Sequence, residues 1–89
     1  MFPNMKKLEK QMKKIQEEMK NKLITGSSGN GLVTVILNGE KNLQEIKINP
    51  ECMDPSDVEG LQDLILAAFE DASQKADREL ASQMPGLPF

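Results

Sequence analysis

The sequence predicts an α+β fold: a long N-terminal helix, a three-stranded antiparallel sheet and a long C-terminal helix, forming a single domain over residues 1–89. Three patterns predict it. Apolar residues recur at heptad spacing near the N-terminus, a β-branched run ends in Asn38-Gly39, and an apolar stripe at helical spacing follows Pro55. Because a chain this small buries only about two-thirds of its unfolded surface, association with a second copy would stabilise it.

Residues 1–22 are predicted to form a basic amphipathic helix. The apolar residues alternate at steps of three and four, which is the spacing of a coiled-coil seam: Met5, Leu8, Met12, Ile15 and Met19. This seam covers an arc of about 80°, narrow enough to suit one partner helix within a dimer. The remaining surface carries a broad basic face, interrupted by Glu17 and made of Lys6, Lys7, Lys10, Lys13, Lys14 and Lys20.

Residues 23–49 are predicted to form the small sheet. Strands are expected at Leu23–Thr25, Leu32–Leu37 and Leu43–Ile48. The glycine- and serine-rich stretch Gly26–Gly31 is expected to be a loop. Asn38-Gly39 is a strong hairpin motif and predicts a two-residue turn between the second and third strands.

A two-residue turn also predicts how the two strands pair, with Leu37 opposite Glu40 and Val33 opposite Gln44. One face of the sheet would then be apolar and need covering by helices: Val33, Val35, Leu37, Ile46 and Ile48. The other face would be half polar: Leu32, Thr34, Ile36, Leu43, Glu45 and Lys47.

Residues 55–84 are predicted to form the second long helix. Ser56 and Glu59 match a capping box, and Asp54 and Asp57 are acids that favour a helix start. The face expected to pack in the core and dimer consists of Val58, Leu61, Leu64, Ile65, Ala68, Phe69, Ala72, Ala76 and Leu80. Residues 85–89 are expected to be a flexible tail.

The lengths of these elements predict a dimer. A helix of this size extends roughly 42 Å, whereas a six-residue strand covers about 20 Å. The helix must therefore overhang its own sheet, and the apolar surface that it exposes there would be covered by a second copy.

Charge is distributed unevenly along the chain. Residues 1–22 carry seven lysines and three glutamates, a balance of +4, whereas residues 51–89 carry nine acids, one lysine and one arginine, a balance of −7. The residues between them are neutral, so the total is −3. The basic face could neutralise DNA phosphates, or it could be an ordinary solvated helix face.

The composition argues against catalysis and cofactor binding. The chain has no histidine and one cysteine, Cys52, which disfavours a metal site and a nucleophile–base pair and excludes an intramolecular disulfide. Gly26–Gly31 lacks the Lys-Ser/Thr of a nucleotide-binding loop. We therefore expect no enzyme activity, metal, cofactor or small-molecule substrate. The sequence contains no recognisable secretory signal or membrane span, which predicts a cytoplasmic protein without a membrane partner.

Six segments, in this order and spacing, carry a resemblance to a known family: Met12–Met19, Thr25–Val33, Leu37–Gly39, Ile46–Pro50, Leu61–Ala72 and Pro85–Phe89. The chain resembles the YbaB/EbfC family over nearly its whole length. The resemblance implies a tweezer-like homodimer in the bacterial cytoplasm that associates with the nucleoid, binds duplex DNA without catalysis and influences gene expression. It places the DNA contacts on the six lysines of the first helix.

Two functional hypotheses follow. In the first, a homodimer clamps the phosphate backbone of duplex DNA with its lysine-bearing helices and has little sequence preference, since no array of side chains suited to reading bases is visible. In the second, the protein is a dimeric interaction module whose basic helix docks an acidic protein partner. Charge reversal at Lys6, Lys10 and Lys13 distinguishes them, because under the first hypothesis it abolishes DNA binding and leaves the dimer intact.

Overall fold

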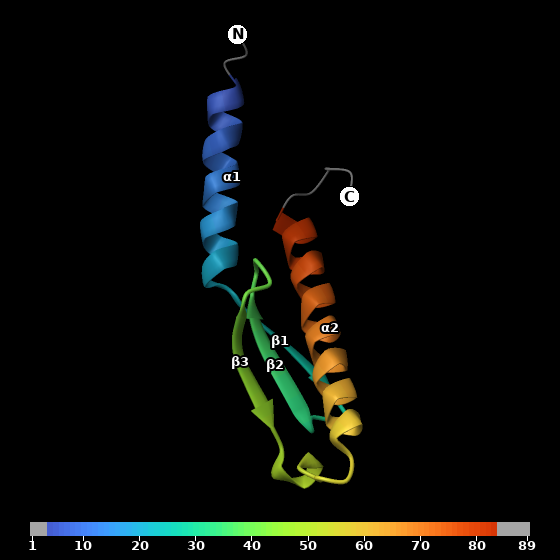
Figure 1. The fold of residues 1–89 in the computed structure, drawn as a ribbon. Helices are drawn as coiled ribbons and strands as arrows, with labels where there is room; N and C mark the ends of the chain where they lie inside the picture. The colour runs from blue at the N-terminus through green and yellow to red at the C-terminus, as the bar shows by residue number, and fades with distance from the viewer. Residues whose placement is uncertain (1–3, 84–89) are drawn as a thin grey trace.

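The computed structural model describes residues 4–83 and confirms the predicted order of elements (Figure 1). These are α1 (Asn4–Asn21), β1 (Leu23–Ser28), β2 (Val33–Asn38), β3 (Leu43–Ile48), the short 3-10 helix η1 (Pro50–Cys52) and α2 (Val58–Gln83). The molecule is elongated, with extents of 63 × 22 × 17 Å. The predicted tail at 85–89 lies outside the described residues. Neither described helix has an apolar stretch long enough to cross a membrane.

The sheet is antiparallel in the order β1-β2-β3, and α2 lies across one of its faces, over β1 and β2 (Figure 1). The core forms between them from fully buried residues: Val33, Val35, Leu37, Ala68 and Ala72. Three small alanines, spaced four residues apart, face the sheet and are buried, so the helix axis approaches the strands closely. Leu61, Leu64 and Ile65 pack around this core and are half-buried.

The first strand is longer than predicted, because Gly26–Ser28 belong to β1 and not to a loop. Gly26 pairs with Val35 directly beneath α2. A Cβ on Gly26 would lie 2.7 Å from the Cβ of Ala72 and still closer to the α2 backbone. The glycine is therefore required for close approach of helix to strand. The actual turn begins at Gly29, where the backbone adopts positive φ angles.

The hairpin between β2 and β3 corrects the predicted two-residue turn. Asn38 ends β2, and its side-chain oxygen accepts hydrogen bonds from the backbone N–H groups of Glu40 (2.9 Å) and Asn42 (3.0 Å). Lys41 adopts φ +67° within this longer loop. The prediction was wrong because the Asn38 side chain organises a loop of four residues, 39–42, in place of a two-residue turn.

The longer loop shifts the strand pairing but leaves most of the face assignment intact. Val33 pairs with Ile48, four residues beyond the predicted Gln44. Because side chains alternate with a period of two, a shift of four keeps them on the predicted face. A β-bulge near Leu37 is the exception, since it pairs this residue with Leu43, which was predicted to lie on the opposite face.

The start of α2 differs from the predicted capping box. Asp57 is the capping residue, because its Oδ1 accepts a hydrogen bond from the Gly60 N–H at 3.1 Å. Ser56 instead donates its hydroxyl (2.7 Å) and its N–H (2.9 Å) to Asp54. These two bonds hold the pKa of the Asp54 carboxyl below its ordinary value. The helix consequently begins at Val58, inside the predicted range of 55–84.

The outer edge of β1 is occupied by side chains of α2. Asp71 Oδ2 accepts a hydrogen bond from the Ser27 N–H at 3.0 Å, and Lys75 Nζ donates to the Thr25 carbonyl at 3.3 Å. Lys75 also forms an ion pair with Asp71 at 3.1 Å. The backbone bond from Ser27, followed by the interaction with Lys75, lowers the pKa of Asp71.

Candidate nucleic-acid interface

The first helix projects from one end of the molecule. It spans 18 residues, or about 27 Å, and contacts the rest of the chain mainly near its C-terminal end (Figure 1). Met19 is 2% exposed, whereas Met5 and Leu8 are 56% and 57% exposed. We call residues 4–18, which precede the buried Met19, the arm.

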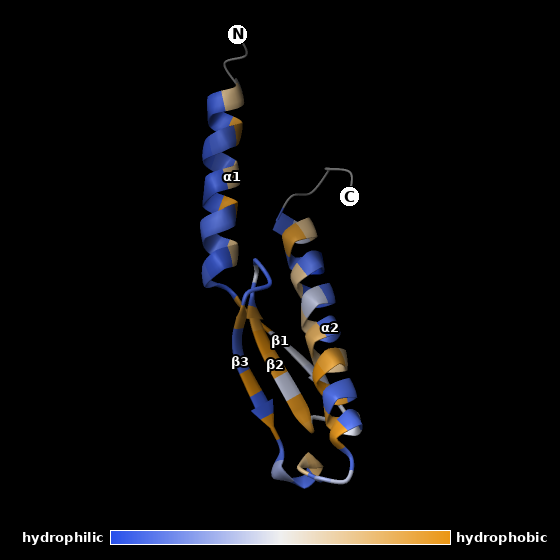
Figure 2. Cartoon of the chain, in the orientation of Figure 1, coloured by the Kyte–Doolittle hydropathy of each residue, from blue (hydrophilic) through white to orange (hydrophobic). Residues whose placement is uncertain are grey.

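The six lysines predicted to bind DNA are all exposed on α1: Lys6, Lys7, Lys10, Lys13, Lys14 and Lys20. None of them forms an ion pair within residues 4–83. The hydrophilic colour covers most of the helix, and its few apolar residues face α2 (Figure 2). With six lysines against three glutamates, α1 carries a net charge of +3 that no neighbouring element neutralises by direct pairing.

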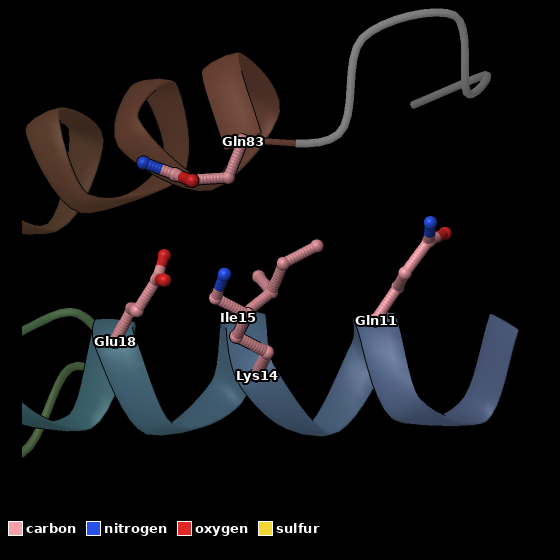
Figure 3. A pocket seen from close by; sticks show the side chains of 5 residues that line it. All are labelled: Gln11, Lys14, Ile15, Glu18 and Gln83. Atoms are coloured by element: carbon pink, nitrogen blue, oxygen red, sulfur yellow. The ribbon is translucent and has the colours of Figure 1, made fainter. Parts of the chain in front are cut away.

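The apolar seam of α1 lies on the side of α2. Met12 and Ile15, in the middle of the seam, are half-buried. They line a groove of about 300 Å³ between α1, the β2–β3 loop and α2, together with Gln16, Met19, Gly39, Glu40 and Leu80. A second hollow lies between α1 and the end of α2, lined by Gln11, Lys14, Ile15, Glu18 and Gln83 (Figure 3). Lys14 therefore borders α2.

Acidic residues of α2 are paired with lysines outside the arm. Glu79 binds Lys22, which follows α1, and Asp77 binds Lys41 of the hairpin loop at 2.7 Å. The hydrogen bond from Lys22 lowers the pKa of Glu79. These long-range pairs were not predicted, because no local pattern links residues 57 positions apart. The two ion pairs hold Lys22 and Lys41 against α2, whereas the lysines of the arm are exposed.

An apolar strip on β3 lies uncovered beside α2. Leu43, Ile46 and Ile48 are 51%, 41% and 37% exposed, although they pair with buried residues of β2. On α2, Val58 and Phe69, predicted to be packed, are also exposed. We call these five residues the apolar strip. It exists because α2 covers only two of the three strands.

The described residues offer little for metal or nucleophilic chemistry. Residues 4–83 contain no group of three histidine, cysteine or acidic side chains placed to hold a metal ion. Cys52 is half-buried, and its Sγ lies 2.9 Å from the Asn49 carbonyl. What the geometry offers instead is a projecting helix bearing exposed amines, which suits a polyanion such as DNA.

Comparisons with known proteins agree with this geometry. Residues 1–88 match the model of the YbaB/EbfC DNA-binding family. The chain is 47% identical over 78 residues to a nucleoid-associated protein of Acetivibrio thermocellus, covering 88% of this chain and 69% of that protein. It is 45% identical over 80 residues to a nucleoid-associated protein of Chloroflexus aurantiacus, covering 90% and 80% respectively.

A solved structure shares the fold. The uncharacterized protein HP0035 from Helicobacter pylori superposes with a TM-score of 0.76 at 23% sequence identity, covering 86% of this chain and 81% of that one. The family match extends over all the described elements, including the lysine-bearing helix and the sheet. The chain therefore belongs to the YbaB/EbfC DNA-binding family.

Proposed function

We propose that this protein is a nucleoid-associated, DNA-binding homodimer that binds the phosphate backbone of duplex DNA through the lysines of α1. The observation that carries the proposal is the set of six exposed lysines on a projecting helix, none of them paired within residues 4–83. Family membership and the names of the bacterial relatives support the same function and a place on the nucleoid.

The proposed mechanism is electrostatic. Each lysine that neutralises a phosphate releases condensed counterions, so affinity falls as the salt concentration rises, with a slope of about −0.9 per contact. Lysine acts as a point charge and reads no base pattern when it contacts phosphate. The protein therefore binds unrelated duplexes with similar affinities. No catalysis, cofactor or small-molecule substrate forms part of the proposal.

The apolar strip is the proposed dimer surface. Burying apolar area contributes roughly 25 cal/mol per Å², which favours covering these strand and helix side chains with a second copy. Dimerisation also brings two arms together, and their combined positive field attracts DNA despite the negative total charge of the chain. Asp77 and Glu79 of α2 are paired with Lys41 and Lys22, which lie outside the arm.

The test is a salt-titrated binding curve on several unrelated duplexes. Replacing Lys6, Lys10 and Lys13 together by glutamine is expected to lower the affinity at least tenfold and to reduce the salt slope by up to about 2.7 for each arm that contacts DNA. The matched control replaces the same residues by arginine, which keeps the charge and is expected to retain binding.

Two results would contradict the proposal. A wild-type affinity that did not change between low and high salt would exclude phosphate clamping. Loss of the dimer in the glutamine variant would identify these lysines as assembly contacts and would favour the protein-interaction alternative.

A further inference from the structure

The arm meets the rest of the chain through a tight contact between α1 and the β2–β3 loop. The Gly39 N–H donates a hydrogen bond to the Met19 carbonyl at 2.7 Å. The Met19 side chain is buried beside the same loop. The same carbonyl accepts the Lys22 N–H at 3.2 Å, which ends the helix. The last turn of α1 is thereby fixed, whereas the arm beyond it is largely exposed.

Gly39 is required at this contact for space. A Cβ built on Gly39 would lie 2.6 Å from the Met19 carbonyl oxygen, 2.7 Å from its Cε and 2.8 Å from its Cβ. The backbone of Gly39 is not in the positive-φ region, so alanine there is conformationally allowed. The effect of an added methyl group would therefore arise from displacement of α1.

Two ion pairs connect this contact to α2. Lys41, in the same loop as Gly39, pairs with Asp77 at 2.7 Å, and Lys22, directly after α1, pairs with Glu79. The two acids lie two residues apart on α2. The loop that holds the arm and the segment that follows the arm are thus both attached to the same stretch of the long helix.

We propose that the contact between Met19 and Gly39, supported by the pairs Lys41–Asp77 and Lys22–Glu79, sets the direction of the arm and thereby positions its lysines for DNA. This rests on the proposed function for its consequence in DNA binding, but the geometry of the arm can be measured without DNA. Gly39, Asp77 and Glu79 are positioning residues and do not themselves contact DNA.

The expected displacement of the arm follows from its length beyond the contact at Met19. Moving the Met19 carbonyl by about 1 Å across one helical turn of about 5.4 Å tilts the helix by roughly 10° and displaces the arm tip, about 22 Å away, by about 4 Å. Phosphates on one strand are spaced by a few ångströms along the helix axis, so a displacement of this size misaligns lysines with them.

The experiment measures a distance between spin labels at Glu9→Cys on the arm and Gln74→Cys on α2, in a Cys52→Ser background diluted with unlabelled protein. Glu9 lies about 15 Å from Met19 along the helix, so the distance is expected to shift by up to about 3 Å in Gly39→Ala. The matched control is Gly60→Ala, at the end of α2 far from Met19, where the three atoms nearest to the added Cβ belong to the side chain of Asp57. It is expected to leave the distance unchanged.

A second variant keeps the test informative if Gly39→Ala does not fold. Asp77→Asn with Glu79→Gln removes both ion pairs at the surface and is expected to broaden the distribution of distances. An unchanged distribution in Asp77→Asn/Glu79→Gln, and in Gly39→Ala where that variant folds, overturns the proposal.

DNA titration separates the two parts of the inference. A shifted arm with about tenfold weaker binding and a smaller salt slope supports it, whereas a shifted arm with wild-type affinity overturns the link to DNA. If the wild-type protein itself fails to bind duplexes, the proposed function fails, and the distance measurement still decides what sets the arm direction.

Discussion

At the scale of single residues, two glycines are required because a helix packs directly against each of them. Gly26 lies under α2, and Gly39 lies against the last turn of α1. Neither has a positive φ angle, so neither is needed for an unusual backbone conformation. Both allow two elements to approach more closely than a side chain would permit. Gly26, which was predicted to lie in a loop, thus serves close packing between β1 and α2.

Replacing Gly26 by alanine is expected to destabilise the fold by about 1–3 kcal/mol, because the added methyl group overpacks the interface between β1 and α2. Chemical denaturation monitored by circular dichroism measures this. Ser27→Ala is the control, since its side chain is exposed and its N–H bond to Asp71 is retained; it is expected to change stability by no more than about 0.5 kcal/mol. Equal stabilities for the two variants would contradict the close-packing argument.

At the scale of elements, what the sequence predicts correctly are the features that periodicity controls. Strand β3 has the predicted bounds, and α1 and α2 end within one residue of theirs. The faces of β2 were also predicted, since a shift in pairing by an even number of residues preserves them. The hairpin length was not, because it depends on side-chain bonds from Asn38 and on contact with Met19 across the fold.

The candidate site was predictable to a similar extent. The lysines of α1 follow from the sequence, and their exposure follows from the narrow apolar seam. The contacts that hold the arm do not, because Lys22–Glu79 and Lys41–Asp77 join residues distant in the chain. Their role in positioning the arm stays a proposal, as does DNA contact by each individual lysine.

The start of α2 gives a test in which the sequence-based and structural assignments differ. Asp57→Ala is expected to cost about 0.5–2 kcal/mol of stability, because it removes the acceptor of the Gly60 N–H. Ser56→Ala removes only an exposed bond to Asp54 and is expected to cost less than about 0.5 kcal/mol. Thermal unfolding of both variants decides; a larger loss for Ser56→Ala would restore the predicted capping box.

At the scale of the whole molecule, the fold separates two kinds of surface. The arm carries exposed positive charge, and the apolar strip lies on the body formed by the sheet and α2. Because these surfaces occupy different elements, a second copy can cover the strip without covering the lysines of both arms. Substitution of the arm lysines is therefore expected to weaken the proposed DNA binding and to leave the proposed assembly intact.

Ile46→Glu, which places a charge in the apolar strip, is expected to convert the proposed dimer into a monomer at micromolar concentrations, as measured by analytical ultracentrifugation. Glu45→Lys is the control, because its side chain lies on the opposite face of the same strand and also changes the charge. The monomer is expected to bind DNA more weakly and with a smaller salt slope, since one arm replaces two. An Ile46→Glu protein that sedimented as a dimer would place the interface elsewhere.

The bonds from Asp71 and Lys75 to the rim of β1 also bear on how many copies can join through their sheets. A sheet whose two edge strands both have unpaired backbone groups can pair with other chains at both edges and extend into fibres. Here the Ser27 N–H and the Thr25 carbonyl on the outer edge of β1 are bonded by side chains of α2, so among residues 4–83 the more open edge of the sheet is β3. Strand pairing beside β1 is therefore disfavoured, and extension of the sheet by further copies is expected at one edge only.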